Sequence, residues 1–278
     1  MKVFKKSFLC TLLAVMLMLC GCAGTGKSVT DDSGRFSFTV LKAGQADAII
    51  LKTQNHSVIL DTGEADDGDK ISEYLKKSGI KAVDYILLTH FDKDHIGGFA
   101  EATEGITAKN ILVPDYEGNG DAYTELIKTV NEKNLSLTRL KEDTSFILDG
   151  VRFEVSVPKA QSYEEDDNDY SLVLSVTHGE NTFLFAGDAE KERLDEILSE
   201  ISASFDFLKV PHHGKYNGNT EKFINVVKPH YAVITDSAKN PASDKTVLLL
   251  EAQNTEIYST KNGDVSVISD GKKITINQ

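Results

Sequence analysis

The chain has 278 residues, of which 40% are hydrophobic and 26% charged, a balance typical of a globular protein with a substantial core. Its 43 acidic residues outnumber its 30 basic residues, which gives a formal net charge of −13. Because an acidic surface does not attract polyanions, the composition argues against a protein that holds nucleic acid through its overall charge.

The first 21 residues have the pattern of a secretory leader. Three lysines among the first six residues precede an apolar stretch from Phe8 to Cys20, in which Thr11 is the polar exception. A stretch of 13 residues is too short to span a bilayer and is typical of the apolar core of a signal peptide. We therefore predict a signal peptide at residues 1–21.

The end of this leader is similar to a bacterial lipobox, in which a small residue precedes the cysteine that becomes lipid-modified. Cys22 follows Gly21 and fits this role, whereas Cys20 follows the bulky Leu19. The sequence thus predicts an exported protein anchored by a lipid on Cys22 to the outer face of the bacterial cell membrane. A plain secretory peptide cut nearby is the alternative.

The segment at residues 22–35 is small and polar, as expected of a flexible tether. All three cysteines lie at or before position 22, so the sequence predicts no disulfide framework in the remainder of the chain. We predict one α/β domain at residues 36–278.

Short apolar strands alternate with amphipathic helices from Phe36 onward. In the first half, the pattern predicts strands at 36–41, 48–53, 57–60, 85–88, 111–113, 146–148 and 151–157, and helices at 71–77, 98–102 and 123–130. In the second half, it predicts strands at 172–177, 182–185, 207–210, 231–235, 256–259, 265–268 and 274–276, and helices at 191–198, 221–227 and 245–252. Two strand-rich halves that each contain helices predict two sheets packed face to face with helices outside.

One short motif, "THFDKDH", presents four possible metal ligands directly after a predicted strand. His90 and Asp92 are two positions apart, so in an extended segment both side chains point to the same side. Asp94 and His95 follow where the chain must turn into a helix, and they can approach the same volume from another direction. So many nitrogen and oxygen ligands in so few positions are difficult to explain as core packing, and they predict a metal site.

Two further groups of possible ligands follow other predicted strands. Asp188 comes after the strand at 182–185, and His212 and His213 come after the strand at 207–210. Each group has a structural explanation when taken singly, because Asp188 could cap a helix and paired histidines could lie on a surface loop. Taken together, three strand ends that present Asp and His favour a two-metal centre, in which a carboxylate can bridge ions about 3.5–4 Å apart.

Asp61 ends another predicted strand, in "VILDTG". It could be a carboxylate that orients a ligand histidine, or it could simply form the turn before Gly63. The sequence does not separate these two roles.

The order of these motifs resembles that of the metallo-β-lactamase superfamily. The resemblance consists of "DTG" (61–63), "HFDKDHIGG" (90–98), "GD" (187–188) and "PHHG" (211–214), and it extends from about Phe36 to the end of the chain. Within the superfamily, "LKAGQADAIIL" (41–51), "NDYSLVL" (168–174) and "LKVPHHG" (208–214) are most similar to the extracytoplasmic hydrolase domain of ComEC-type competence proteins. They are also similar to surface phosphocholine esterases. The resemblance implies an αββα sandwich with the site at one edge, between the two sheets.

The resemblance also implies roles for single residues. The implied metal ligands are His90, Asp92, Asp94, His95, Asp188 and His213. The first two would hold one ion, the next two together with His213 would hold the other, and Asp188 would bridge them. The implied catalytic residues are Asp94, which would position the attacking water, and His212, which would face the substrate.

Two positions depart from the pattern of the resembled proteins. Many superfamily members have a further histidine upstream of the bridging aspartate, whereas this region reads "NDYS", so that Asn168 or Asp169 would have to replace it. The ComEC-like pattern also has a histidine in a "GHP" loop, and Asn240 stands in its place. The first departure predicts a weaker first metal site, and the second predicts the loss of a proton donor or a phosphate contact and so a lower activity on the usual substrate.

The expected cofactors are two divalent metal ions. Asp92 in place of an imidazole makes the first site harder, so zinc is the default expectation and manganese is more plausible than at a site built only of histidines.

The expected function is a dinuclear metal-dependent hydrolase that cleaves phosphodiesters, either DNA or a small envelope phosphodiester, at the cell surface. The acidic charge weighs against DNA, because Lys209 and Lys215 are the two cations that flank the motifs. A noncatalytic surface binding module that keeps the fold is the alternative; Asn168 and Asn240 favour it, whereas the intact ligand set opposes it. The sequence indicates the membrane and a phosphoester substrate as partners and does not point to a protein partner.

Overall fold

A computed structural model describes residues 34–163, 167–201 and 203–278. The predicted signal peptide at 1–21, the predicted lipidation site at Cys22 and nearly all of the predicted tether lie outside these residues. Within the described ranges, no helix is long and apolar enough to cross a membrane.

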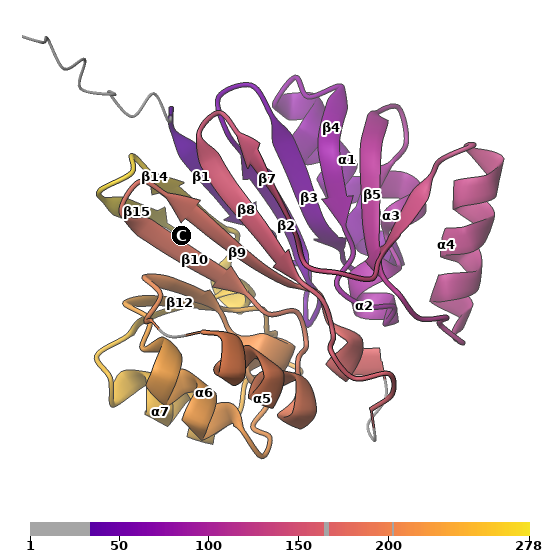
Figure 1. Cartoon of the computed structure of the whole chain (residues 1–278). Helices are drawn as coiled ribbons and strands as arrows, with labels where there is room; N and C mark the ends of the chain where they lie inside the picture. The colour runs from indigo at the N-terminus through magenta and orange to yellow at the C-terminus, as the bar shows by residue number, and fades with distance from the viewer. Residues whose placement is uncertain (1–33, 164–166, 202) are drawn as a thin grey trace, which may run out of the picture. The chain divides into compact units, whose positions relative to one another are not determined.

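The described strands form two sheets (Figure 1). The first sheet has eight strands in the order β15-β14-β1-β2-β3-β4-β5-β6. Their bounds are β1 Phe36–Val40, β2 Ala48–Lys52, β3 Ser57–Thr62, β4 Ala82–Leu87, β5 Thr107–Pro114, β6 Leu137–Leu140, β14 Val265–Ser269 and β15 Ile274–Asn277. Pairing is parallel from β3 to β6 and antiparallel between the other neighbours.

The second sheet has seven strands in the order β13-β12-β11-β10-β9-β8-β7. Their bounds are β7 Thr144–Leu148, β8 Val151–Ser156, β9 Val173–His178, β10 Asn181–Phe185, β11 Phe207–Lys209, β12 Tyr231–Ile234 and β13 Glu256–Ser259. Pairing is parallel from β10 to β13 and antiparallel from β7 to β10.

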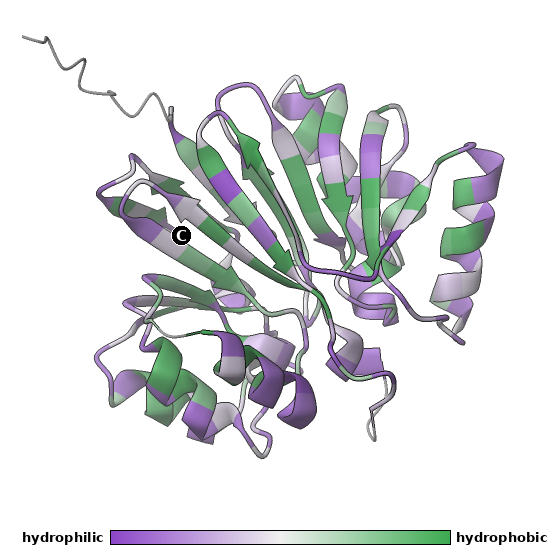
Figure 2. Cartoon of the chain, in the orientation of Figure 1, coloured by the Kyte–Doolittle hydropathy of each residue, from purple (hydrophilic) through white to green (hydrophobic). Residues whose placement is uncertain are grey.

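The main core lies between the two sheets, because alternate residues of each strand face the other sheet. In β1, the side chains of Phe36 and Phe38 are buried there, and the ring of Phe38 contacts the ring of Phe207 with centroids 4.8 Å apart. In β2, Ile49 joins the same core, whereas its neighbour Ile50 is buried on the opposite face, under the helices. The period of two thus makes both faces of these central strands apolar, as Figure 2 shows for the strand ribbons.

Helices cover the outer face of each sheet (Figure 1). The first sheet is covered by α1 Gly68–Lys77, α3 Phe99–Ala102 and α4 Asp121–Glu132, and the second by α5 Lys191–Glu200, α6 Thr220–Val227 and α7 Asp244–Glu251. The remaining helical turns are α2 Lys93–Ile96, η1 Ala65–Asp67, η2 Asp167–Tyr170, η3 Pro211–Gly214 and η4 Thr260–Asn262. In α1, the buried residues Ile71 and Leu75 are one helical turn apart, which is the spacing expected of a helix with one apolar face. The predicted αββα sandwich is confirmed.

The structure differs from the predicted elements mainly at polar stretches. The sequence analysis missed β6, which has four residues with a largely unburied pattern and pairs in parallel with β5. It also placed the start of β5 four residues late, because the first half of that strand is mostly exposed. Both segments are strands because of pairing with a neighbour, which a hydrophobicity pattern does not reveal.

Parallel pairing brings the carboxyl ends of several strands to one edge. In the first sheet, β3, β4 and β5 end side by side, and in the second sheet β10, β11 and β12 do so. The segments that contain the predicted ligands follow β4, β10 and β11. Residues more than ninety positions apart in the sequence therefore converge.

Candidate metal centre

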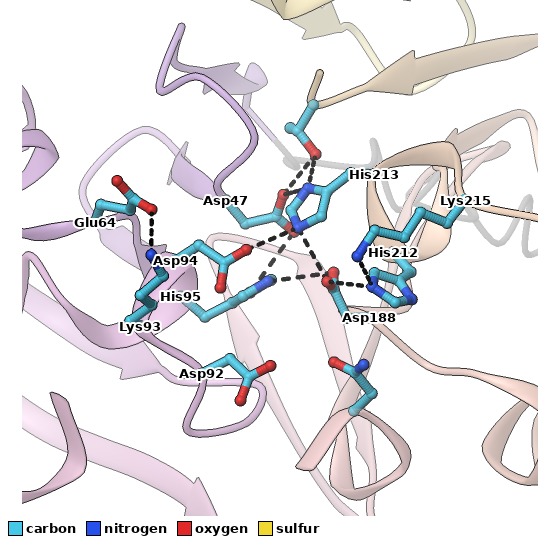
Figure 3. Close-up of polar contacts among 12 residues, drawn as sticks. Asp47, Glu64, Asp92, Lys93, Asp94, His95, Asp188, His212, His213 and Lys215 are labelled. Carbon is cyan, nitrogen blue, oxygen red and sulfur yellow. Dashed lines mark hydrogen bonds and ion pairs between the residues drawn. The ribbon is translucent and has the colours of Figure 1, made fainter. Parts of the chain in front are cut away.

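Four of the predicted ligands form one cluster at this edge (Figure 3). Asp94, His95, Asp188 and His213 each offer a ligand atom, and these atoms all lie within 4.8 Å of one another. Asp188 is central, since its Oδ1 is 3.2 Å from Nε2 of His95 and its Oδ2 is 3.0 Å from Nε2 of His213. Asp94 closes the cluster, with its Oδ2 3.3 Å from the same His213 nitrogen.

The histidine nitrogens at this edge fit a metal better than they fit hydrogen bonds. Within the described residues, Nε2 of His90, His95 and His213 is buried and has no partner with hydrogen-bond geometry. Buried polar atoms are normally paired, because an unpaired one costs about 1–3 kcal/mol. Imidazole nitrogens and carboxylate oxygens are common ligands of zinc and other divalent metals, so divalent metal ions fit these residues.

His90 and Asp92 lie next to the cluster rather than within it. The His90 ring is 4.1 Å from the His95 ring, centroid to centroid, and its Nε2 is 3.7 Å from Oδ2 of Asp92. The alternation expected of an extended segment is present, because both side chains turn toward the same space. These two residues form a possible second ligand group beside the first.

Asp61 orients two of the histidines. Its Oδ2 accepts hydrogen bonds from Nδ1 of His95 at 2.8 Å and from the Thr89 hydroxyl at 2.8 Å, and its Oδ1 accepts one from the Thr89 amide at 2.7 Å. The Thr89 hydroxyl lies in turn 3.0 Å from Nδ1 of His90. Because Nδ1 of His95 faces a carboxylate, it carries the proton, and its Nε2 lone pair is left for a metal. Asp61 also has a positive φ of 55°, so it both forms the turn and orients a ligand histidine.

His213 is oriented by two successive hydrogen bonds, through Thr235 to Asp47, that the sequence analysis did not find. Nδ1 of His213 is 2.9 Å from the Thr235 hydroxyl, which donates a hydrogen bond to Oδ1 of Asp47 at 2.7 Å. Since the hydroxyl donates to the carboxylate, its oxygen accepts from His213, which fixes the same tautomer as at His95. Asp47 sits in "GQAD" just before β2, and Thr235 follows β12.

Lys209 corrects one expectation. The sequence analysis took it as a cation beside the site that could attract a substrate, but its side chain is 1% exposed and forms an ion pair with Asp47. Its Nζ also donates to the carbonyl oxygen of Gly187 at 3.2 Å and lies 3.5 Å from Oδ1 of Asp188. Lys209 therefore supplies a fixed positive charge beneath the cluster and does not face a substrate.

The electrostatics of the metal-free cluster follow from this packing. Burial lowers the pKa of His95, but the carboxylates of Asp188 and Asp61 outweigh burial and hold it well above its usual range. Burial also raises the pKa of Asp188, but His213, His95 and Lys209 outweigh it and hold that pKa well below its usual range. The cluster without metal is thus a network of charged imidazoles and carboxylates.

The backbone of the "PHHG" turn is strained. His212 and His213 both have positive φ, 47° and 53°, a conformation that costs a residue with a Cβ roughly 1–3 kcal/mol. Gly214 continues the turn with φ +78°, where glycine has no such penalty. Two consecutive strained histidines at the cluster indicate that their placement is maintained against a local cost, as is frequent at functional sites.

His212 lies between two charged groups at the edge of the cluster. Its Nδ1 is 2.5 Å from Oε1 of Glu190, and its Nε2 is 2.6 Å from Nζ of Lys215 and 3.9 Å from Oδ2 of Asp188. The ammonium of Lys215 donates to Nε2, so the imidazole proton is on Nδ1 and faces Glu190. The sequence analysis did not single out Glu190, which is the N-cap residue of α5.

Asn168 and Asp169, the two predicted replacements for the absent histidine, make different contacts. Oδ1 of Asp169 accepts the backbone N–H groups of Glu190 at 2.8 Å and Arg193 at 3.2 Å, so Asp169 caps the start of α5 and is not part of the cluster. Nδ2 of Asn168 is 3.4 Å from Oε1 of Glu190. Of the two residues, Asn168 is therefore the one that reaches the surroundings of His212.

These features define a class of protein: an αββα sandwich with a cluster of His and Asp residues at the edge where its two sheets meet. The chain matches the model of the metallo-beta-lactamase superfamily over residues 41–234 and belongs to that superfamily. The superfamily and the cluster together imply divalent metal ions and a metal-dependent hydrolase fold.

Curated relatives come from the competence proteins. The chain is 27% identical over 204 residues to ComE operon protein 3 of Bacillus subtilis, covering 71% of this chain and 26% of that protein. It is 28% identical over 205 residues to competence protein ComA of Neisseria gonorrhoeae, covering 73% and 27%. The chain thus spans about a quarter of the length of these relatives, and the predicted ComEC-type resemblance is confirmed.

Solved structures support the fold. Igni18, described as a metallo hydrolase from Ignicoccus hospitalis, aligns with a TM-score of 0.54 at 14% identity, covering 87% of this chain and 99% of that one. At this identity the likeness concerns the fold alone.

Proposed function

We propose that this chain is a dinuclear metal-dependent phosphodiesterase at the cell surface. The observation that carries the proposal is the set of three buried histidine Nε2 atoms without hydrogen-bond partners. Those of His95 and His213 lie beside the carboxylates of Asp188 and Asp94, and that of His90 lies 3.7 Å from Asp92. This arrangement supports metal binding rather than a structural role, because a structural cluster would pair these nitrogens.

Each residue of the cluster has a role in this proposal. The two ions would be held by six side chains: His90, Asp92, Asp94, His95, Asp188 and His213. When bound, such ions lower the pKa of water and polarise a phosphoryl oxygen, with zinc as the expected metal and manganese as the alternative.

The remaining polar side chains at the site would bind the substrate, orient the water or orient the ligand histidines. A cleft beside the cluster is lined by Asp94, Lys215 and Lys239 among other residues. The half-buried Asp94 would orient the attacking water there by accepting its hydrogen bond. His212 would face the substrate, and Lys215, whose ammonium already donates to that imidazole, would stabilise negative charge on the phosphoryl oxygens. Asp61 and Asp47 would keep the imidazoles in the ligating tautomer.

A metal-and-substrate panel tests the proposal. The full-length protein is loaded with zinc or manganese, its metal content is measured, and hydrolysis of bis(p-nitrophenyl) phosphate is followed. His95→Ala and Asp188→Ala should lose metal and turnover, whereas the exposed residues changed in His230→Ala and Asp195→Ala should keep both. A wild-type protein that binds no metal and cleaves no phosphodiester would instead be a noncatalytic module that keeps the fold.

The location is part of the proposal. The lysine-rich start, the apolar stretch and the residues around Cys22 support a lipid anchor at the outer face of the membrane. Metabolic labelling with a fatty acid, compared between the wild type and Cys22→Ser, tests it. Label that persists in the variant would overturn the assignment to Cys22.

A further inference from the structure

A tyrosine that the sequence analysis did not single out contacts the backbone of the metal-binding loop. The phenolic oxygen of Tyr116 accepts a hydrogen bond from the backbone N–H of Phe91 at 2.8 Å, across 25 positions of sequence. Phe91 is the residue between His90 and Asp92, the ligand group beside the cluster. Tyr116 follows the end of β5, which pairs in parallel with β4, the strand that precedes the loop. The hydroxyl therefore connects this loop to the end of a neighbouring strand.

Aromatic packing restrains the ring of Tyr116. It stacks on the ring of Tyr170, with centroids 4.2 Å apart and an angle of 15° between the planes. It also contacts the ring of the buried Phe91, whose centroid is 4.6 Å away. Pairs of this kind stabilise a ring beyond the burial of its surface. The two contacts thus keep the hydroxyl in place beneath the Phe91 N–H.

The carboxylate of Asp92 depends on this backbone contact. Its side chain is 43% exposed, and although Asp92 is the N-cap residue of α2, the carboxylate makes no cap hydrogen bond to that helix, all of which the structure describes. By contrast, the carboxylate of Asp188 is 4% exposed and lies between His95 and His213. Figure 3 shows Asp92 apart from these residues. The direction of the Asp92 carboxylate is therefore set mainly by the position of its own backbone.

The two ligand groups also differ in how many side chains converge. Ligand atoms of four residues, among them His95 and His213, lie within 4.8 Å of one another, whereas Oδ2 of Asp92 is 3.7 Å from Nε2 of His90 alone. A site with fewer converging ligands depends more on each of them being held in place by its surroundings.

We propose that Tyr116 is a positioning residue for the ion held by His90 and Asp92, and that it acts through the N–H of Phe91. This inference rests on the proposed dinuclear function and names a residue on which one of the two ions depends. Removal of the hydroxyl should lower the affinity for that ion by about 10- to 100-fold, as is usual for groups that orient metal ligands. The affinity for the ion at His95 and His213 should not change.

Titration of the metal-free, full-length protein with cobalt(II) tests the inference. Calorimetry gives the number of bound ions and the affinity for each, and the visible absorption of bound cobalt gives a spectroscopic signature of each site. The wild type should bind two ions. Tyr116→Phe keeps the ring and its stacking on Tyr170, and it should bind one ion with wild-type affinity and the other more weakly by the factor above. Excess metal should restore its turnover of bis(p-nitrophenyl) phosphate.

Tyr123→Phe is the matched control. The ring of Tyr123 also contacts the ring of Phe91, with centroids 4.7 Å apart, but its hydroxyl donates to Glu117 and accepts from Arg139 instead of contacting the loop. This variant should keep both affinities. In the metal-free protein, hydrogen exchange of the Phe91 amide should be faster in Tyr116→Phe alone, which gives a readout that needs neither metal nor turnover.

The outcomes separate the inference from the function. Wild-type affinities for both ions in Tyr116→Phe, or an equal loss for both, would overturn the positioning role and leave the phosphodiesterase function intact. A wild type that binds two ions but cleaves no phosphodiester would overturn the function, and the cobalt titration would still decide the role of Tyr116. A wild type that binds fewer than two ions would overturn both.

Discussion

Asp61 accepts a hydrogen bond from Nδ1 of His95 at 2.8 Å, across 34 positions of sequence. The carboxylate thus sets both the tautomer and the direction of a ligand histidine. Asp61→Asn keeps a residue that tolerates positive φ but removes the charge, and we expect the affinity for zinc to fall by about 10- to 100-fold. Calorimetric titration with zinc measures the effect.

Asp149→Asn is the matched control for that experiment. Asp149 also has a positive φ, 46°, and accepts hydrogen bonds from Asn55 and Thr53 in a turn outside the cluster. Its replacement should leave zinc affinity unchanged. Equal affinities of both variants and the wild type would contradict an orienting role of Asp61.

Thr235→Val tests the chain from Asp47 to His213. Valine keeps the shape but removes the hydroxyl, leaving Nδ1 of His213 and Oδ1 of Asp47 without their partner. We expect a loss of about 1–3 kcal/mol in the free energy of unfolding by urea and a weaker zinc affinity. Thr235→Ser, which keeps the hydroxyl, should retain the zinc affinity of the wild type. An unchanged zinc affinity in Thr235→Val would show that only the shape of the side chain matters.

Lys209→Met should strongly destabilise the protein, because it leaves the buried carboxylate of Asp47 uncompensated. The expected cost in urea unfolding is about 3–5 kcal/mol. The double variant Lys209→Met/Asp47→Asn should recover much of it, since an amide keeps the hydrogen bond from Thr235 without a buried charge. Lys128→Met, which breaks the exposed pair with Glu125, should cost less than about 1 kcal/mol.

The metal-free protein should lose thermal stability as the pH rises above about 6.5. The pKa of His95 is raised in the folded state, so its contribution is complete below the unfolded value of about 6.5 and is lost as the pH rises through the folded value. The pKa of Asp188 is lowered, so its contribution is present above about 3.9 and is lost as the pH falls. Stability should therefore be greatest between these two values.

A scan of Tm against pH in EDTA checks this expectation, with zinc-loaded protein as the comparison. Zinc needs neutral imidazoles, so the loaded protein should keep its Tm at pH 8. A metal-free Tm that increases from pH 6.5 to 8 would contradict the assignment of charged histidines.

Gly98→Ala should destabilise the fold beside the cluster. A Cβ at Gly98 would lie 2.3 Å from the carbonyl oxygen of Thr62 and 2.6 Å from the amide nitrogen of Gly68, both of them backbone atoms that cannot rotate away. We expect a loss of at least about 1–3 kcal/mol in urea unfolding. Gly120→Ala is the control, because nothing lies within 4 Å of its Cβ, and comparable losses in both variants would contradict the packing explanation.

Much of the fold was predictable because its signals are local. The apolar alternation of β1 and β2 and the one-turn spacing of Ile71 and Leu75 report burial that the residues themselves require. By contrast, β6 was missed because its four residues form a strand through pairing with β5, and pairing partners are not encoded in a local pattern.

The amino-acid sequence by itself determined which side chains are available as metal ligands. They are the His and Asp residues within positions 90–95, 188 and 212–213, which follow directly after apolar strands. Only the tertiary structure decided which of them meet. Parallel pairing in both sheets aligned the strand ends, so Asp94, His95, Asp188 and His213 became one cluster, with His90 and Asp92 beside it. Burial decided the roles of the lysines near the site: Lys209 is buried and pairs with Asp47, whereas Lys239 and Lys215 are exposed and line the cleft.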